Sequence, residues 1–427
     1  MPIRLNSLTA TFLVVASMLG TGILTTTGMI MSLVKTPSAV ILLWALGGLL
    51  AWFGAYCYGE IIKCVPKNGG EAVILKEFFS PALGEAAGWT SFVVGFAASN
   101  AATSIALSAY LSEAAPNLGV PSQVVACSVL ILVTALHSVL GPAGLRIQTG
   151  LAAIKFSLLA CLAIYGLFLA TPNPAVQLAA ESSTVTTSFG ADWGVAMMLV
   201  MFAYSGWNAA IYAAGETHNP GRTVRRAMII GTAITLVLYV SINLALLRHL
   251  PPAEIEGVIP IISVLVKSLF GSQASVWFSG LVAVALLSSL GASAFLGPRV
   301  LAAMLAWFRG EAATEGKTAY VSPKLIWLQG GISIFMVVTG TFEQILTIMG
   351  FLLGLFPILC VFALYRVVVV SGGRAPAVAR YFFGPLFIMS MSGILCLGAM
   401  QRPTEVSIAI AMVAVFLILR RSMRRFA

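Results

Sequence analysis

Two runs of small residues interrupt long apolar segments and could do chemistry through their backbone. SMLGTGILTTTG places Gly20, Thr21 and Gly22 in the middle of the first apolar segment, and FAYSGWNAA places residues 205–208 in the middle of the sixth. Glycine costs about 1 kcal/mol relative to alanine inside a helix, but small residues also let membrane helices pack closely. The pair indicates more than either motif alone, because broken helices at equivalent places of two inverted repeats are the best sequence indication of a binding site in the membrane.

Unwinding at these motifs would expose peptide dipoles that can bind a zwitterion. Free N–H groups are left where the second half-helix begins, and free C=O groups where the first half ends. In a medium of low dielectric constant these groups need partners. A carboxylate is expected to accept hydrogen bonds from the N–H groups near Gly20 to Ile23, supported by the helix dipole. An ammonium is expected to donate to nearby carbonyls of both segments: Ser17, Met18, Phe202, Ala203 and Ser205.

Side chains at the second motif would complete this pocket. Trp207 either shapes the pocket or merely packs, and we include it because it lies within the break. Ser205, Asn208 and Thr25 could add polar contacts, while Gly and Ala dominate nearby. The acidic residues closest to the apolar core fall near helix ends or in loops: Glu60, Glu85, Glu113, Asp192, Glu216 and Glu343. With no carboxylate expected at midplane depth, the pocket is predicted to accept an uncharged side chain.

The sequence contains no familiar motif of a catalytic or metal-binding site. His137, His218 and His249 are isolated, without an HExxH motif, and no CxxC occurs among the six cysteines. A membrane enzyme would need paired carboxylates, histidine clusters or a nucleophile with its base, and a channel would show a ring of charge or a filter repeat. We therefore expect no catalytic residue, no metal and no cofactor.

The composition indicates the elements that must position these motifs. The chain has 427 residues, of which 59% are hydrophobic and 9% charged, whereas soluble domains carry roughly 25% charged residues. A spanning helix needs about 20 apolar residues. Twelve helices are predicted near 8–31, 39–62, 85–111, 121–140, 144–170, 193–215, 226–247, 274–304, 325–340, 343–365, 381–399 and 404–419. Two short features interrupt them: a turn with an amphipathic helix over 66–81, and an excursion over 249–271.

The lysines and arginines indicate the orientation in the membrane. If the N-terminus is cytoplasmic, 20 of the 24 fall on the inner side, and the exceptions are Lys35, Arg248, Lys267 and Arg402. The positive-inside rule therefore predicts cytoplasmic N- and C-termini in a multi-pass protein of the cell membrane. The basic residues are scattered among apolar runs, so nucleic acid is not an expected partner of this chain of net charge +10.

Several motifs together resemble the amino acid–polyamine–organocation (APC) superfamily. They are GTGI in the first helix, PKNGG at 66–70, GLRIQTGLAAIK at 144–155 and FAYSGWNAAIYAAGETHNPGRTVRRA at 202–227. The last is most similar to the L-type amino acid transporters and their bacterial relatives. The resemblance covers roughly residues 8–300, and the last four helices match it only in hydropathy.

The resemblance implies a fold and roles for particular residues. The fold is an all-α bundle of the LeuT type with a five-plus-five inverted repeat, in which helices 1 and 6 are discontinuous. The whole chain (1–427) would form one transmembrane domain, with a first half at 8–170, a second half at 193–340 and two additional helices at 343–419. Gly20, Thr21 and Gly22 would hold a substrate carboxylate, Phe202 would close over the substrate as an aromatic gate, and Glu216 would lie near the cytoplasmic gate. Glu216 either pairs with an arginine such as Arg222 or Arg299, or forms a solvated helix end.

Lys155 is the cation that lies well inside an apolar run, and two readings of it stay open. It can extend to the membrane surface along its aliphatic stem. Alternatively, its ammonium occupies the space near the first-helix break, Ser288 and Ser289 where a relative would bind sodium, which the resemblance associates with sodium-independent transport. A lysine buried there could exchange a proton during the cycle, and a charge fixed there equally permits simple exchange.

Two departures from the family pattern bear on gating and partners. The loop after Arg299 reads WFRGEAATEGKTAYVSP in place of the usual Gly-x-x-Pro element, and residues 112–120 contain no cysteine, so no disulfide-linked heavy subunit is expected.

The predicted function is transport of neutral amino acids by alternating access, with protons as a further partner if transport is proton-coupled. A sodium-coupled symporter, an exporter and a carrier of polyamines or cationic amino acids remain alternatives.

Overall fold

The computed structural model describes residues 6–140, 145–174, 176, 192–217, 219–308, 321–371 and 376–426. These residues form helices joined by short connections, with no strand among them. The helices of the N-terminal part are α1 (Ser7–Met18), α2 (Thr21–Val34), α3 (Pro37–Ile61), α4 (Gly70–Phe78), α5 (Pro81–Thr90), η1 (Ser91–Ala98), α6 (Ser99–Ala114), η2 (Pro116–Leu118), α7 (Ser122–Leu140), α8 (Leu145–Ile164) and η4 (Tyr165–Leu169).

The C-terminal part continues in the same way after the connection that follows η4. Its helices are α10 (Trp193–Ala203), η5 (Ala209–Glu216), α11 (Pro220–His249), α12 (Pro252–Ile255), α13 (Ile261–Phe270), α14 (Ser272–Phe308), α15 (Pro323–Thr339), α16 (Phe342–Ser371), η6 (Ala379–Phe383), α17 (Gly384–Gln401) and α18 (Pro403–Phe426). Each of the twelve predicted segments coincides with one helix or with consecutive helical elements of the described residues, so the all-helical prediction is confirmed.

Among the described residues, eight helices are long and apolar enough to cross a bilayer, or up to nine if the bent pair α1–α2 forms one span. Four shorter apolar helices are α10, α13, α15 and the apolar part of α18. Large apolar side chains remain exposed on outer helices, such as Val237 on α11 at 65% and Val139 on α7 at 82%. Such surfaces suit a hydrocarbon solvent and would be unfavourable in water.

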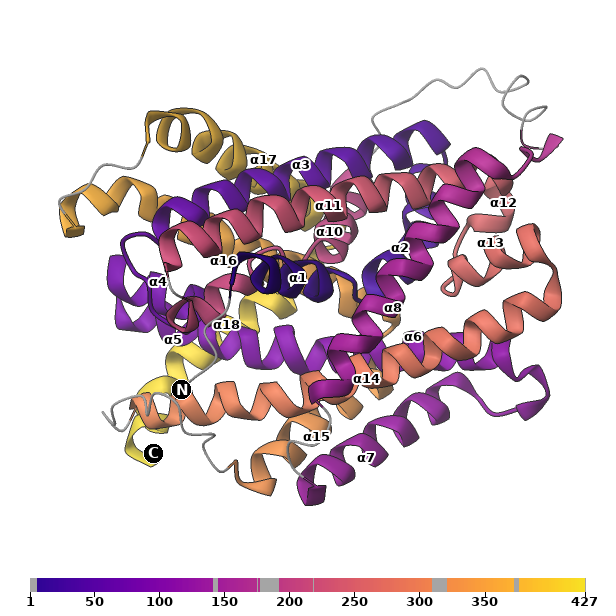
Figure 1. The fold of residues 1–427 in the computed structure, drawn as a ribbon. Helices are drawn as coiled ribbons and strands as arrows, with labels where there is room; N and C mark the ends of the chain where they lie inside the picture. Colours follow the sequence, from indigo (N-terminus) through magenta and orange to yellow (C-terminus); the bar gives the residue numbers. More distant parts are fainter. Residues whose placement is uncertain are drawn as a thin grey trace.

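The interior of the bundle is built around the broken segments. In Figure 1, α1 lies near the middle of the molecule, and α3 and α11 run side by side along one flank. The contacts of α1 with α11 and of α2 with α10 fix both halves of the first segment against other spans. Every residue of α10 after Trp193 is buried, which makes this helix part of the core.

Basic side chains gather at the end of the bundle that contains α4 and α5, which we call the basic end. There Glu60 of α3 pairs with Lys63 at 2.6 Å and with Arg225 of α11 at 2.8 Å. Arg420 of α18 lies 3.5 Å from Glu85 of α5, which places the C-terminal helix at the same end. The predicted helix within 66–81 is present there as α4, and the predicted excursion over 249–271 is present at the opposite end as α12 and α13 (Figure 1).

Candidate binding site at two helix breaks

The first break separates α1 from α2 at the predicted glycine motif. α1 ends at Met18, α2 begins at Thr21, and their axes differ by 40°. Gly20 occupies the N-cap position of α2 and provides no side-chain cap, so the N–H groups of the first turn, from Thr21 to Ile23, are left for another partner. Gly20 is partly accessible and Ser17 is exposed, although both lie in the middle of an apolar segment.

The second break separates α10 from the short helix η5. α10 ends at Ala203, residues 204–208 form a turn, and η5 begins at Ala209. Gly206 has a φ of 98°, a left-handed conformation that glycine adopts at little cost. The hydroxyl of Tyr204 donates to the carbonyl oxygen of Trp44 at 3.0 Å and ties the start of this turn to α3.

The two breaks touch each other because glycine stands at both contact points. A Cβ at Gly22 would lie 2.3 Å from the Cα of Ala203, and a Cβ at Gly206 would lie 2.8 Å from the carbonyl oxygen of Ser17. Any side chain at either position would force the segments apart. The structure therefore brings the backbone groups predicted from both motifs to one place, and substrate binding there stays a prediction.

Some of the predicted carbonyl acceptors already have protein donors. The carbonyl oxygen of Met18 accepts from the Gly20 N–H at 2.7 Å and from the hydroxyl of Tyr239 on α11. The carbonyl of Phe202 accepts from the Ser205 N–H at 2.9 Å. The Phe202 carbonyl also accepts from the Tyr204 N–H. Since a carbonyl oxygen has two lone pairs, the carbonyls of Met18 and Phe202 are both fully used in this conformation.

Lys155 of α8 reaches the first break. Its Nζ donates to the carbonyl oxygen of Leu19 at 3.0 Å and to Oγ of Ser289 on α14 at 2.9 Å. The residue is buried, with 7% exposed, so the side chain does not extend to the membrane surface. Ser288 is half-buried beside Ser289, and within the described residues it forms no hydrogen bond with Lys155. The coupling role of the three residues stays a prediction.

The aromatic side chains of the second segment are buried. Trp207 is 4% exposed and packs edge-on against Tyr58 of α3, with ring centroids 4.7 Å apart, and against Phe387 of α17 at 6.3 Å. Phe202 is 5% exposed. Their predicted roles as pocket wall and gate stay predictions. The side chain of Glu216 and the segment 309–320 that replaces the Gly-x-x-Pro element lie outside the residues that the structure describes.

Glu71 is a buried carboxylate that sequence reasoning missed. Its Oε1 accepts hydrogen bonds from the hydroxyl of Tyr58 and from Nδ2 of Asn208, both at 2.8 Å. Burial raises the pKa of the Glu71 carboxyl from 4.5 to about 7, against the lowering effect of these two hydrogen bonds. The residue thus connects α4 with the break after α10.

The sequence signal for Glu71 was the double glycine before it. Gly69 and Gly70 have φ values of 121° and 61°, which turn the chain back so that the first turn of α4 faces the bundle. A carboxylate in the first turn of a helix is also favoured by the helix dipole. The short helix was predicted correctly, but the prediction treated 66–81 only as a peripheral amphipathic segment and did not connect it with the site.

Comparison with known proteins gives an independent indication of the family. The family model described as amino acid permease matches residues 5–419. The chain is similar to the serine/threonine exchanger SteT of Bacillus subtilis, with 26% identity over 403 residues that cover 91% of this chain and 89% of SteT. It is also similar to the mouse b(0,+)-type amino acid transporter 1, with 27% identity over 247 residues that cover 57% and 50% of the two chains.

The mouse Asc-type amino acid transporter 1 is 26% identical over 296 residues, which cover 67% of this chain and 55% of that protein. The matches thus span about half the length of the mammalian relatives and most of SteT. The printed names of these relatives are those of transporters and an exchanger. The match over nearly its whole length shows that the chain belongs to the amino acid permease family, within the APC superfamily.

Proposed function

We propose that this permease carries neutral L-amino acids across the cell membrane by alternating access around the two helix breaks. The observation that supports this most is the contact of Gly22 with Ala203 and of Gly206 with Ser17, which puts the uncapped start of α2 and the end of α1 against the second break. The substrate carboxylate binds the uncapped N–H groups from Thr21 to Ile23, since the Gly20 N–H donates to the Met18 carbonyl. The substrate ammonium binds free carbonyl capacity near Ser17 and Ala203.

The proposed architecture follows from the same breaks. We place the chain in the bilayer with twelve spans and cytoplasmic termini, the first half at 8–170 and the second at 193–340 forming inverted repeats. In that arrangement α1–α2 and α10–η5 are equivalent discontinuous helices. No disulfide-linked heavy subunit is included, because residues 112–120 contain no cysteine.

Sodium independence is proposed from the position of Lys155. Its ammonium occupies a place between the Leu19 carbonyl and the Ser289 hydroxyl, two oxygen ligands of the kind that a hard cation would use. A fixed positive charge there repels a sodium ion by simple Coulomb interaction. Either proton coupling through Lys155 or exchange of one amino acid for another is compatible with that charge, and the relative SteT is named an exchanger.

A cationic substrate is the second candidate, and one observation favours it. Glu71 lies within hydrogen-bonding distance of Asn208, so a buried carboxylate is connected to the break. The neutral-substrate proposal is preferred because both hydrogen bonds at Glu71 come from partners within the protein. Its raised pKa of about 7 also leaves a substantial part of the carboxyl uncharged near neutral pH.

Uptake into proteoliposomes with a panel of amino acids tests this proposal. Neutral L-amino acids should compete with one another, whereas arginine and putrescine should not compete at similar concentrations. Uptake should be unchanged by a sodium gradient and should respond either to a pH gradient or to amino acid loaded inside the vesicles. Saturable arginine uptake with the affinity of a neutral substrate would replace the proposal with the cationic candidate, and sodium-dependent binding would exclude the proposed role of Lys155.

A further inference from the structure

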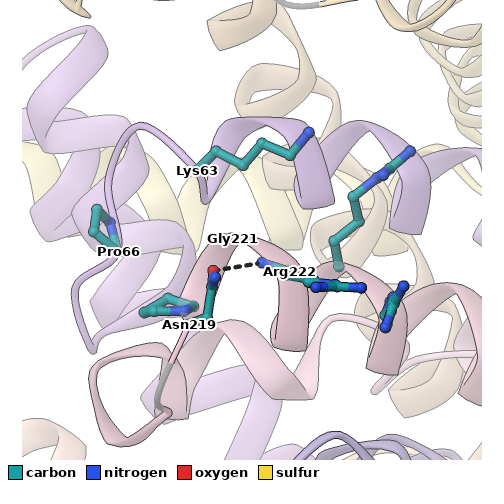
Figure 2. A pocket seen from close by; sticks show the side chains of 8 residues that line it. Lys63, Pro66, Asn219, Gly221 and Arg222 are labelled. Atoms are coloured by element: carbon teal, nitrogen blue, oxygen red, sulfur yellow. Dashed lines mark hydrogen bonds between the residues drawn. The ribbon is translucent and has the colours of Figure 1, made fainter.

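A cavity of about 530 Å³ lies at the basic end, outside the site described above. It is formed where the C-terminal end of α3 meets the start of α11 (Figure 2). Figure 2 shows Lys63 on one side of this space and Asn219 with Arg222 on the other. Asn219 caps α11, because its Oδ1 accepts from the Arg222 N–H at 3.2 Å. Two further arginines of α11, Arg225 and Arg226, complete the charged lining.

The charges of this cavity are not balanced. Two of its four cations, Lys63 and Arg225, pair with the two carboxylate oxygens of Glu60. Arg222 and Arg226 are exposed and form no ion pair with another described residue. The dipole at the start of α11 adds to the positive potential. The cavity therefore attracts an anion and lacks one within the described part of the chain.

The same face of α11 continues as an apolar surface. Ile230, Ile234 and Val237 follow Arg226 at helical spacing and are 48%, 38% and 65% exposed. A groove of about 470 Å³ between α8 and α11 includes Ile234 and Val237 of this face, and all of its lining residues except Ser241 are apolar. At 1.5 Å per residue, Val237 lies about 16 Å from Arg226 along the helix, which is close to half of a hydrocarbon core about 30 Å thick.

We propose that the cavity and this face of α11 together bind one anionic phospholipid. Its phosphate group lies between Arg222 and Arg226, and an acyl chain follows Ile230, Ile234 and Val237. Basic pockets between transmembrane helices at the membrane surface suit anionic headgroups. Free inorganic phosphate shares the chemistry of the headgroup but makes no use of the apolar face, so the adjoining apolar surface favours the lipid as the source of the phosphate.

The lipid is tested with the purified full-length protein in detergent, titrated with phosphatidylglycerol or phosphatidylcholine. Native mass spectrometry measures the lipid retained, and thermal unfolding measures the stabilisation. The test variant is Arg222→Gln/Arg226→Gln. The control Arg248→Gln/Lys267→Gln removes two exposed cations at the opposite end of the bundle.

Wild-type protein should retain phosphatidylglycerol in preference to phosphatidylcholine. The test variant should bind phosphatidylglycerol about 25-fold more weakly, which is about 2 kcal/mol for two basic residues, and the control should match the wild type. If the double variant does not fold, Arg226→Gln alone should show about a fivefold loss. Equal retention of both lipids, or an equal loss in the control, would overturn the proposal. Displacement of phosphatidylglycerol by inorganic phosphate alone would identify free phosphate as the ligand and would also overturn it.

Discussion

At the scale of single residues, Lys155 and Glu71 show how ionisable groups are accommodated in an apolar bundle. An ammonium has three protons to donate, and two of those of Lys155 go to the Leu19 carbonyl and the Ser289 hydroxyl. Leu19 belongs to the break, where the carbonyl has no partner within its own helix. The ammonium of Lys155 therefore supplies the hydrogen-bond donor that the Leu19 carbonyl lacks at the break, and this carbonyl stabilises the buried charge.

Replacing this lysine should affect transport more than folding. In Lys155→Ala, the Leu19 carbonyl and the Ser289 hydroxyl lose a partner, which costs about 1–3 kcal/mol of the free energy of unfolding. Under the proposed mechanism, reconstituted Lys155→Ala protein should lose uptake driven by a pH gradient or become locked in one state. Lys267→Ala, an exposed cation on α13, is the control and should transport normally. Uptake by Lys155→Ala that responds to pH as in the wild type would remove this residue from the mechanism.

Glu71 should make stability depend on pH. Its carboxyl has a pKa of about 7 in the folded protein and 4.5 as a free group. Between these values the folded chain binds more protons than the unfolded chain, so the free energy of unfolding should fall as pH rises from about 4.5 to 7. The full effect above pH 7 is about 3 kcal/mol.

The variant Glu71→Gln should lack this dependence, because it keeps the shape of the side chain without the charge. Denaturant unfolding between pH 4.5 and 8 measures it. Glu77→Gln, on the same helix but paired with Lys67 at the surface, should keep the slope of the wild type. A Glu71→Gln variant with the same slope as the wild type would show that folding does not raise the pKa of the Glu71 carboxyl.

At the scale of elements, the contact between the two broken segments depends on the absence of two side chains. Gly22→Ala would place its Cβ 2.3 Å from the Cα of Ala203, and a backbone atom cannot move without moving α10. Gly206→Ala would combine a contact at 2.8 Å with a left-handed φ of 98°. Overpacking of this kind costs about 1–3 kcal/mol, and the strained backbone adds a similar amount at Gly206.

We therefore expect both alanine variants to lower the melting temperature and to abolish saturable uptake. Gly393→Ala is the matched control, since nothing lies within 4 Å of its Cβ and alanine favours the helix α17 by up to about 1 kcal/mol. Thermal unfolding and proteoliposome uptake are measured for all three variants, and only Gly393→Ala should keep the stability and the uptake of the wild type. Gly22→Ala with normal stability and uptake would mean that α2 and α10 are not in close contact during transport.

At the scale of the whole molecule, the distribution of charge distinguishes the two ends of the bundle. The basic end contains Lys63, Arg225 and Arg420, with partners on α3 and α5. The opposite end has Lys35 paired with Glu256 at 2.7 Å. Because basic residues are retained on the cytoplasmic side, the basic end is expected to face the cytoplasm.

Labelling of single cysteines in intact cells tests this orientation. In a background without the native cysteines, Lys267→Cys should react with a membrane-impermeant maleimide from outside, and Arg226→Cys should react only after the cells are opened. Both positions are exposed, so burial does not protect either one. The reverse labelling pattern would indicate the opposite orientation in the membrane, with both termini outside the cell.

The sequence by itself determined the helices, the two breaks and the family, because hydropathy, glycine and short motifs act within one segment. It also indicated that Lys155 belongs to an apolar segment, but not which of two directions its side chain takes. Only the tertiary structure decided that Lys155 reaches Leu19, 136 residues away, and that Asn208 reaches Glu71 at a separation of 137. Such contacts depend on how distant helices pack, and a local pattern carries no information about which buried carboxylate will face which break.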